Sequence, residues 1–181
     1  MVILGVDPGT LFTGYAVIEG VNEKLKLLEC DVIKMNPKMT LPVRLKTIYD
    51  NLVQVIDEFV PDEFAIETAF YSKNVQSTLK LGHARGVSIL AAVNKQIPTT
   101  EYSPREVKKS VVGSGAASKE QVQFMVCKIF KIKELPKKLD ISDAIAVAVC
   151  HHHNFLSKGL SKNRQSWADY VSKNPSKVKF N

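Results

Sequence analysis

The sequence predicts an α/β fold in which a five-stranded mixed sheet is flanked by helices. Three short β-prone segments come first, and two further apolar segments alternate with long helical patterns after residue 40. Successive strands with short connections favour antiparallel pairing, whereas strands separated by helices favour parallel pairing. Both patterns occur in this one chain, which is typical of a mixed sheet.

The five predicted strands are apolar or rich in β-branched residues, and turn-forming residues separate them. They span residues 1–6, 13–19, 25–33, 63–67 and 97–102. The connections among the first three are short, so we expect an antiparallel meander there. The first and fourth strands share a design, because each apolar run ends in a carboxylate, Asp7 and Glu67 respectively.

Five helices are predicted, at about residues 41–60, 75–95, 105–109, 119–130 and 140–156. In the first, apolar residues recur every three or four positions, which indicates one buried face. Ser118 and Gln121 match a capping box that begins the fourth helix. The second helix carries small residues between Gly82 and Ala92. Because small residues permit close helix packing, we treat this helix as a candidate dimer surface as well as a core element.

The length and composition suit one globular domain, predicted at residues 1–157, followed by a basic and flexible tail at 158–181. The chain has 181 residues, 45% of them hydrophobic, which is enough for a core that needs no staples. Three cysteines lie far apart, so neither a disulfide framework nor a Cys-x-x-Cys metal pair is expected. No signal peptide and no membrane-spanning run of apolar residues is recognised, and we expect a cytoplasmic protein.

The net charge of +7 favours a polyanionic partner, and its distribution is uneven. Residues 1–60 contain 6 Lys and Arg against 8 Asp and Glu. Residues 104–138 contain 9 against 3, and residues 158–181 contain 6 against 1. Basic segments beside acids at strand ends suit metal-assisted chemistry on a phosphodiester backbone, although a basic surface can also serve solubility alone.

Four acidic residues are candidates for one catalytic site: Asp7, Glu67, Asp140 and Asp143. If the two acid-ending strands are parallel neighbours, Asp7 and Glu67 meet at one edge of the sheet, where open α/β sheets bind ligands. Asp140 and Asp143 are three residues apart at the start of an apolar helix, so they share one face. Purely structural explanations stay open, because Asp7 suits a turn and the pair suits a helix cap.

Carboxylates without a cysteine or histidine cluster suit Mg²⁺ or Mn²⁺ rather than Zn²⁺. Two Mg²⁺ ions would supply both a nucleophile from water and neutralisation of the phosphate charge. The rival metal site is the run His151-His-His153. Consecutive residues on a helix point in different directions, so these three side chains are not expected to bind one ion.

The order of several motifs resembles the RuvC-type Holliday-junction resolvases, the crossover junction endodeoxyribonucleases. The motifs cover about residues 1–156 and are Asp7-Pro-Gly-Thr-x-x-Thr-Gly-Tyr-Ala-Val, Ala65-Ile-Glu67-x-x-Phe70, Lys80-Leu-Gly-x-Ala-Arg-Gly86, Val107-Lys-x-x-Val-Val-Gly113 and Asp140-x-x-Asp-Ala-x-Ala146. The resemblance implies an RNase H-like fold and a homodimer. It also implies Mg²⁺-dependent, paired symmetric nicking of four-way DNA junctions in recombination and repair. A branch-migration helicase partner and association with the nucleoid are implied as well.

The resemblance assigns roles to individual residues. The family's four catalytic acids fall on the four carboxylates named above, and its basic residues near the scissile phosphate fall on Lys108 and Lys119. The aromatic residue that stacks on an unpaired base falls on Phe70. Thr68 replaces a longer polar side chain, so the preferred cut sequence is not predicted. Further DNA contacts are expected at Tyr71, Lys73, Arg85, Arg105 and Lys109.

Two other functions are weighed against a resolvase. The pattern around Asp7 also resembles the first phosphate loop of actin-like ATPases and sugar kinases, but those enzymes need a second lobe for which 181 residues leave no room. A junction-binding protein without nuclease activity is the other alternative. Four retained acids argue against it, because negative charge near phosphate weakens DNA binding.

Overall fold

The computed structural model describes residues 1–22, 24–68, 74–133 and 139–161. Within these residues it confirms the predicted α/β fold and its five-stranded mixed sheet, whose strand order is β3-β2-β1-β4-β5. β1 (Val2–Asp7), β2 (Phe12–Val21) and β3 (Lys24–Lys34) form the antiparallel meander. β4 (Glu63–Glu67) pairs parallel with β1, and β5 (Thr99–Tyr102) pairs parallel with β4.

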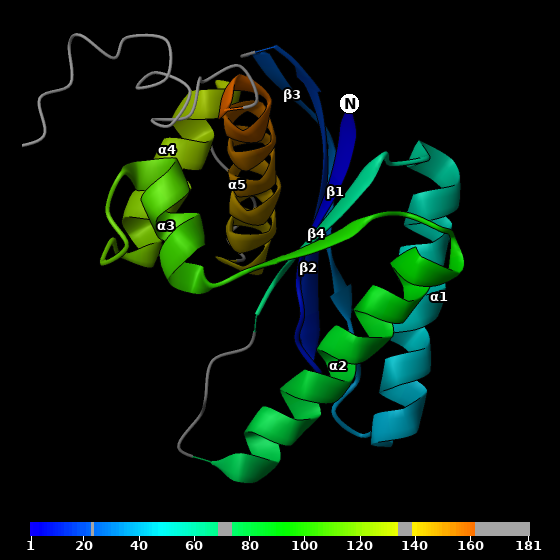
Figure 1. Ribbon diagram of the computed structural model, residues 1–181. Coiled ribbons are helices and arrows are strands. Elements are labelled where there is room, and N and C mark those ends of the chain that lie inside the picture. The colour runs from blue at the N-terminus through cyan, green and yellow to red at the C-terminus, as the bar shows by residue number, and fades with distance from the viewer. Residues whose placement is uncertain (23, 69–73, 134–138, 162–181) are drawn as a thin grey trace, which may run out of the picture.

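Helices cover both faces of the sheet (Figure 1). α1 (Leu41–Phe59) and α2 (Val75–Asn94) lie on one face. α3 (Pro104–Val112), α4 (Lys119–Phe130) and α5 (Leu139–Ser161) lie on the other. Three predictions of length were wrong: α5 ends five residues later than residue 156, α3 is longer than residues 105–109, and β5 begins two residues after residue 97.

The alternation of side chains along β1 and β4 divides the core into two clusters. Leu4, Val6 and Ile66 pack toward α1 and α2. Ile3 and Ala65 pack toward the helices of the opposite face. Because side chains alternate with a period of two, the residues that end the two strands point to the face of α5. The pattern of the strands therefore directs both terminal carboxylates toward one helix.

Helix α5 is the central element of that second face. Its residues from Ala144 to Cys150 are all fully buried, and it packs against β1 and β2. Two glycines allow the approach: a Cβ at Gly5 would lie 2.5 Å from the carbonyl oxygen of Ala144, and one at Gly14 would lie 2.1 Å from that of Asp140. Close contact at Gly14 brings the acidic start of α5 to the strand beside Asp7.

Candidate active site

Asp7 and Glu67 end two adjacent parallel strands. Val6 of β1 is paired with Ile66 of β4, and each acid is the next residue along its strand. The two carboxylates therefore meet at the same edge of the sheet and on the face that α5 covers. This geometry is the one predicted from the two apolar runs.

A pocket of about 160 Å³ lies at this edge. Strand-end acids, one α5 acid and two lysines line it together with apolar residues of α3 and α4; the eight residues are Asp7, Glu67, Pro104, Val107, Lys108, Lys119, Val122 and Asp143. Asp140 is not among them. It lies in the first turn of α5, and its charge acts on Asp7.

Lys119 is the basic residue in closest contact with the acids. Its ammonium donates a hydrogen bond to Oδ2 of Asp143 over 2.7 Å. Desolvation lowers the pKa of Lys119, but this hydrogen bond and the charges of Asp143, Asp7 and Asp140 outweigh it, so the net shift is upward. The side chain of Lys119 is 52% exposed, whereas that of Asp143 is 14% exposed. The ammonium therefore connects the buried acids with the solvent at the mouth of the pocket.

Burial and mutual repulsion disfavour the ionised forms of the two strand-end acids. Desolvation, followed by the charges of Glu67, Asp143 and Asp140, raises the pKa of Asp7 well above its usual value. Desolvation and the charge of Asp143 raise the pKa of Glu67 to about 7. The nearby lysines oppose both shifts without cancelling them. The site has more acidic groups than its own cations neutralise, and such an excess favours the binding of a divalent cation.

The donor set suits a hard divalent metal ion, because its ligands are carboxylate oxygens. Asp7, Glu67 and Asp143 line one pocket, and Asp140 lies one helical turn from Asp143. As they stand, no three acidic, histidine or cysteine side chains in the described residues are arranged to hold an ion. The carboxylates would have to turn toward it, and Asp143 would have to exchange its bond with Lys119.

A sequence model of the crossover junction endodeoxyribonuclease RuvC family matches residues 3–151. The chain belongs to this family. The RuvC match contains all four candidate acids and both pocket lysines, and it removes the ATPase alternative. Members of the RuvC family are nucleases that hydrolyse phosphodiester bonds and depend on metal ions.

Curated RuvC relatives match nearly the whole chain. The crossover junction endodeoxyribonuclease RuvC of Cytophaga hutchinsonii is 46% identical, and the alignment covers 98% of this chain and 88% of the relative. The RuvC of Chloroherpeton thalassium is 45% identical over 98% of this chain and 99% of the relative. The similarity therefore extends past the family match and into the residues that follow α5.

Solved structures agree with these RuvC relatives. Thermus thermophilus RuvC in complex with a Holliday junction substrate is 31% identical, with a TM-score of 0.82 over 87% of this chain and 96% of that chain. A yeast mitochondrial Holliday junction resolvase is 14% identical, with a TM-score of 0.58 over 87% of this chain and 85% of that chain, and this likeness concerns the fold alone. The shared fold is RNase H-like.

The structure describes only some of the remaining predicted DNA contacts. Phe70, Tyr71 and Lys73 lie outside the described residues. Arg105 and Lys109 are exposed on α3, beside the pocket lysine of the same helix. Arg85 instead forms an ion pair with Glu101, which connects α2 with the edge strand β5. Arg85 is thus already engaged within the protein, and its contact with DNA stays a prediction.

The histidine run points to three different elements, as its spacing predicts. His151 shares a hydrogen bond with the hydroxyl of Tyr102 on β5, over 3.0 Å. His152 contacts the backbone carbonyl of Asn22 between β2 and β3, over 2.8 Å. His153 contacts the hydroxyl of Ser110 on α3, over 3.1 Å. The run fastens α5 to its neighbours, a structural role that the sequence analysis did not anticipate.

The apolar residues that line the pocket were also not predicted from the sequence. Val107 and Val122 are buried and line the pocket beside the two lysines. The spacing along the helix could have indicated Val122, because it follows Lys119 by three residues and therefore lies on the same face.

Among the described helices, none combines the length and hydrophobicity that crossing a membrane requires.

Proposed function

We propose that this chain resolves four-way DNA junctions by hydrolysing phosphodiester bonds, with paired symmetric nicks that serve recombination and repair. The observation that carries the proposal is the pocket in which strand-end carboxylates, an α5 carboxylate and two lysines converge. RuvC membership supports the choice of DNA as substrate. The Thermus thermophilus relative, solved in complex with a Holliday junction substrate, supports the choice of a four-way junction.

Asp7, Glu67, Asp140 and Asp143 would hold Mg²⁺, as two ions per site, with Mn²⁺ as a functional substitute. Such ions supply positive charge at the phosphate and lower the pKa of an attacking water. Support comes from the all-oxygen donor set and from the raised pKa values of Asp7 and Glu67. An acid held at high energy by burial and repulsion gains most when a cation arrives.

Lys108 and Lys119 would stabilise negative charge on the transferring phosphate. Both line the pocket, from α3 and α4 respectively. In a site partly shielded from water, a fixed ammonium stabilises developing charge more strongly than it would in bulk solvent. Lys119 would then exchange its bond with Asp143 for one with the phosphate, while the apolar side chains of Val107 and Val122 limit the access of water.

DNA would approach on the face that α3, α4 and α5 cover. Exposed basic residues on α3 would contact the sugar-phosphate backbone, and Phe70 would stack on an unpaired base near the crossover. The further contacts in this proposal are Tyr71, Lys73, Arg85, Arg105 and Lys109. The basic tail from residue 158 onward would add charge outside a nuclease domain of residues 1–157.

The active form in this proposal is a homodimer that pairs through α2. The buried residues of α2 begin at Ala84, and its first turns extend past the strands (Figure 1). The outward side carries exposed apolar side chains, from Val75 at 72% exposed to Leu90 at 49%, with open space at Gly82 and Gly86. Two such stripes can pack closely because glycine allows helices to approach.

The cellular setting follows from the same activity. An enzyme that resolves junctions during recombination would work in the cytoplasm on nucleoid DNA, together with a branch-migration helicase complex. The support here is RuvC membership.

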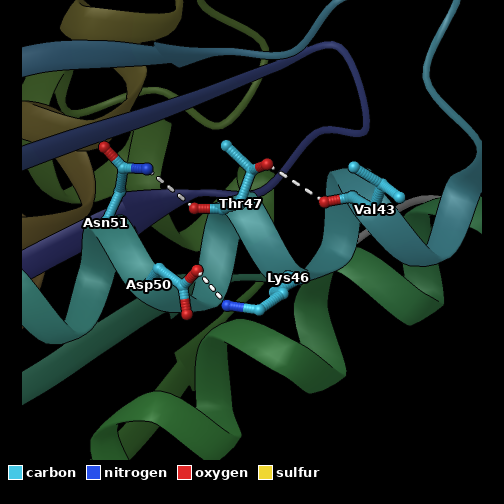
Figure 2. Close-up of polar contacts among 5 residues, drawn as sticks. All are labelled: Val43, Lys46, Thr47, Asp50 and Asn51. Carbon is cyan, nitrogen blue, oxygen red and sulfur yellow. Dashed lines mark hydrogen bonds and ion pairs between the residues drawn. The ribbon is translucent and has the colours of Figure 1, made fainter.

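The decisive experiment compares wild type with Asp7→Asn on a synthetic four-way junction in Mg²⁺. We expect the variant to bind the junction in a gel-shift assay but not to cut it, because a neutral amide binds Mg²⁺ more weakly than a carboxylate does. Asp50→Asn is the matched control, since Asp50 is an exposed acid on α1 that pairs with Lys46, as Figure 2 shows. The control should cut normally.

Two further measurements complete this test. EDTA should stop cleavage by wild type while junction binding persists. Linear duplex, assayed beside the junction, separates a resolvase from a general nuclease. Cleavage by Asp7→Asn at the wild-type rate would contradict the assignment of the site. Junction binding by wild type without any cleavage in Mg²⁺ or Mn²⁺ would instead indicate a binding protein.

A further inference from the structure

The loop that follows Asp7 is closed by a single buried hydroxyl. Thr13, at the start of β2, is fully buried. Its hydroxyl donates to the carbonyl of Gly9 over 2.7 Å and accepts from the N–H of the same residue over 3.3 Å. Both backbone polar groups of Gly9 are therefore satisfied by one side chain, which fixes the turn at Pro8-Gly9.

Two more hydrogen bonds hold the rest of the loop. Nη1 of Arg44, on α1, donates to the carbonyl of Thr10 over 3.3 Å. The N–H of Met35 donates to the carbonyl of Leu11 over 2.9 Å. Three successive loop residues are thus bound to three separate parts of the chain. The loop is also closely packed, because a Cβ at Gly9 would lie 2.1 Å from the carbonyl oxygen of Phe12.

Asp7 is the last residue of β1, and this loop follows it directly. It is paired with Gly14, the residue after Thr13, in the β1–β2 ladder. Its carboxylate lies among the charges of Glu67, Asp143 and Asp140, which repel it. The side chain can rotate about its own bonds, but the backbone sets the place from which the carboxylate starts, so the rigidity of the loop matters to its position.

We propose that Thr13 is a positioning residue, whose hydroxyl holds the Pro8-Gly9 turn and thereby orients the Asp7 carboxylate for a divalent cation. The inference rests on the proposed function, because it assigns Asp7 to a metal site. Thr13 itself touches neither the metal nor DNA. Valine has nearly the shape of threonine but would leave the N–H and C=O of Gly9 without their partner, whereas serine keeps the hydroxyl.

The test compares Thr13→Val with Thr13→Ser. For Thr13→Val we expect unchanged junction affinity and a cleavage rate lower by about 10- to 100-fold, the usual effect of misplacing a metal-binding group. The rise in melting temperature that Mn²⁺ causes in the DNA-free protein should shrink in parallel. Thr13→Ser should restore both values toward wild type, because it restores the hydrogen bonds.

Thr47→Val is the matched control for a lost threonine hydroxyl. The hydroxyl of Thr47 also donates to a carbonyl four residues away, that of Val43, over 3.0 Å, but within α1 and far from the acids in sequence (Figure 2). This variant should cut at the wild-type rate and respond normally to Mn²⁺. A defect in it comparable with that of Thr13→Val would overturn the proposal, since any lost threonine bond would then have the same effect.

Each remaining outcome is decisive. Wild-type cleavage by Thr13→Val overturns the proposal, and so does a Thr13→Ser variant as slow as Thr13→Val. If Thr13→Val fails to fold, Thr13→Ala removes the same hydroxyl, and a wild-type rate together with a full Mn²⁺ response in that variant overturns the proposal. Failure of wild type to cut any junction counts against the proposed function alone, because the Mn²⁺ response still reports on the loop.

Discussion

Asp7 and Glu67 are placed to bind a cation, but their ionised forms lower the stability of the fold. Each ends a strand at the edge of the sheet, where burial and neighbouring acids raise its pKa. For Glu67 the value of about 7 lies above the ordinary 4.5. A carboxyl group with a raised folded-state pKa stabilises the protein while it is protonated, below pH 4.5, and this contribution is lost as the pH rises through 7.

Because the ionised form of Glu67 destabilises the fold, a prediction follows for Glu67→Gln, which keeps the shape of the neutral acid. In EDTA at pH 8 the variant should be more stable than wild type, by about 1–3 kcal/mol. The gain should shrink as the pH falls toward 4.5, because wild type then becomes neutral at this position. Urea unfolding at several pH values measures the difference, and a variant less stable than wild type at pH 8 would contradict it. Cleavage in Mg²⁺ should be lost throughout.

The position of a single residue could be predicted where a local hydrophobic pattern indicated it. The apolar runs before Asp7 and Glu67 identified them as strand ends, and the apolar helix after Asp143 identified a buried start. The pairing of Arg85 with Glu101 was not predictable, because the two residues are joined only when α2 packs beside β5. The hydroxyl of Thr13 was missed for a different reason, since its role depends on the path of a loop.

At the scale of elements, the position in which α5 packs on the sheet decides whether the four acids converge. Asp140 and Asp143 belong to a helix distant in sequence from β1, and no local pattern states how closely the two approach. The approach depends on Gly5 and Gly14, because a Cβ at either position would collide with the backbone of α5. The histidine run then binds the middle of α5 to β5, to the β2–β3 connection and to α3.

Gly14→Ala tests the close packing of α5 against the sheet. The added Cβ would lie 2.1 Å from the carbonyl oxygen of Asp140, so either α5 or β2 must shift. We expect a lower melting temperature, since overpacking of this kind typically costs about 1–3 kcal/mol. We also expect cleavage to fall more steeply than junction binding, because the acidic start of α5 moves away from Asp7. Scanning calorimetry measures the melting temperature, and the junction assay measures cleavage. An unchanged cleavage rate would contradict the claim that close packing at Gly14 positions the acids of α5.

At the scale of the whole molecule, the acidic pocket and the exposed apolar stripe of α2 lie on opposite faces of the sheet. The acidic pocket lies on the face of α3, α4 and α5, where α3 and α4 also carry the lysines that border it. The opposite face presents α2 with its exposed apolar stripe. DNA binding on one face and self-association through the other would leave both active sites of a dimer free. The small residues of α2 are visible in the sequence, but which of its sides stays exposed is not, because that depends on packing against α1.

Leu90→Glu tests association through α2, with Val43→Glu as its control. Leu90 is 49% exposed on the apolar stripe, and Val43 is 48% exposed on α1 (Figure 2), so the two substitutions add similar charge at similar exposure. Burying an unpaired carboxylate between two helices is strongly unfavourable, so Leu90→Glu should sediment as a monomer while Val43→Glu matches wild type. The monomer should nick one strand of a junction without the paired second nick. A dimeric Leu90→Glu variant that makes paired nicks would show that the subunits meet elsewhere.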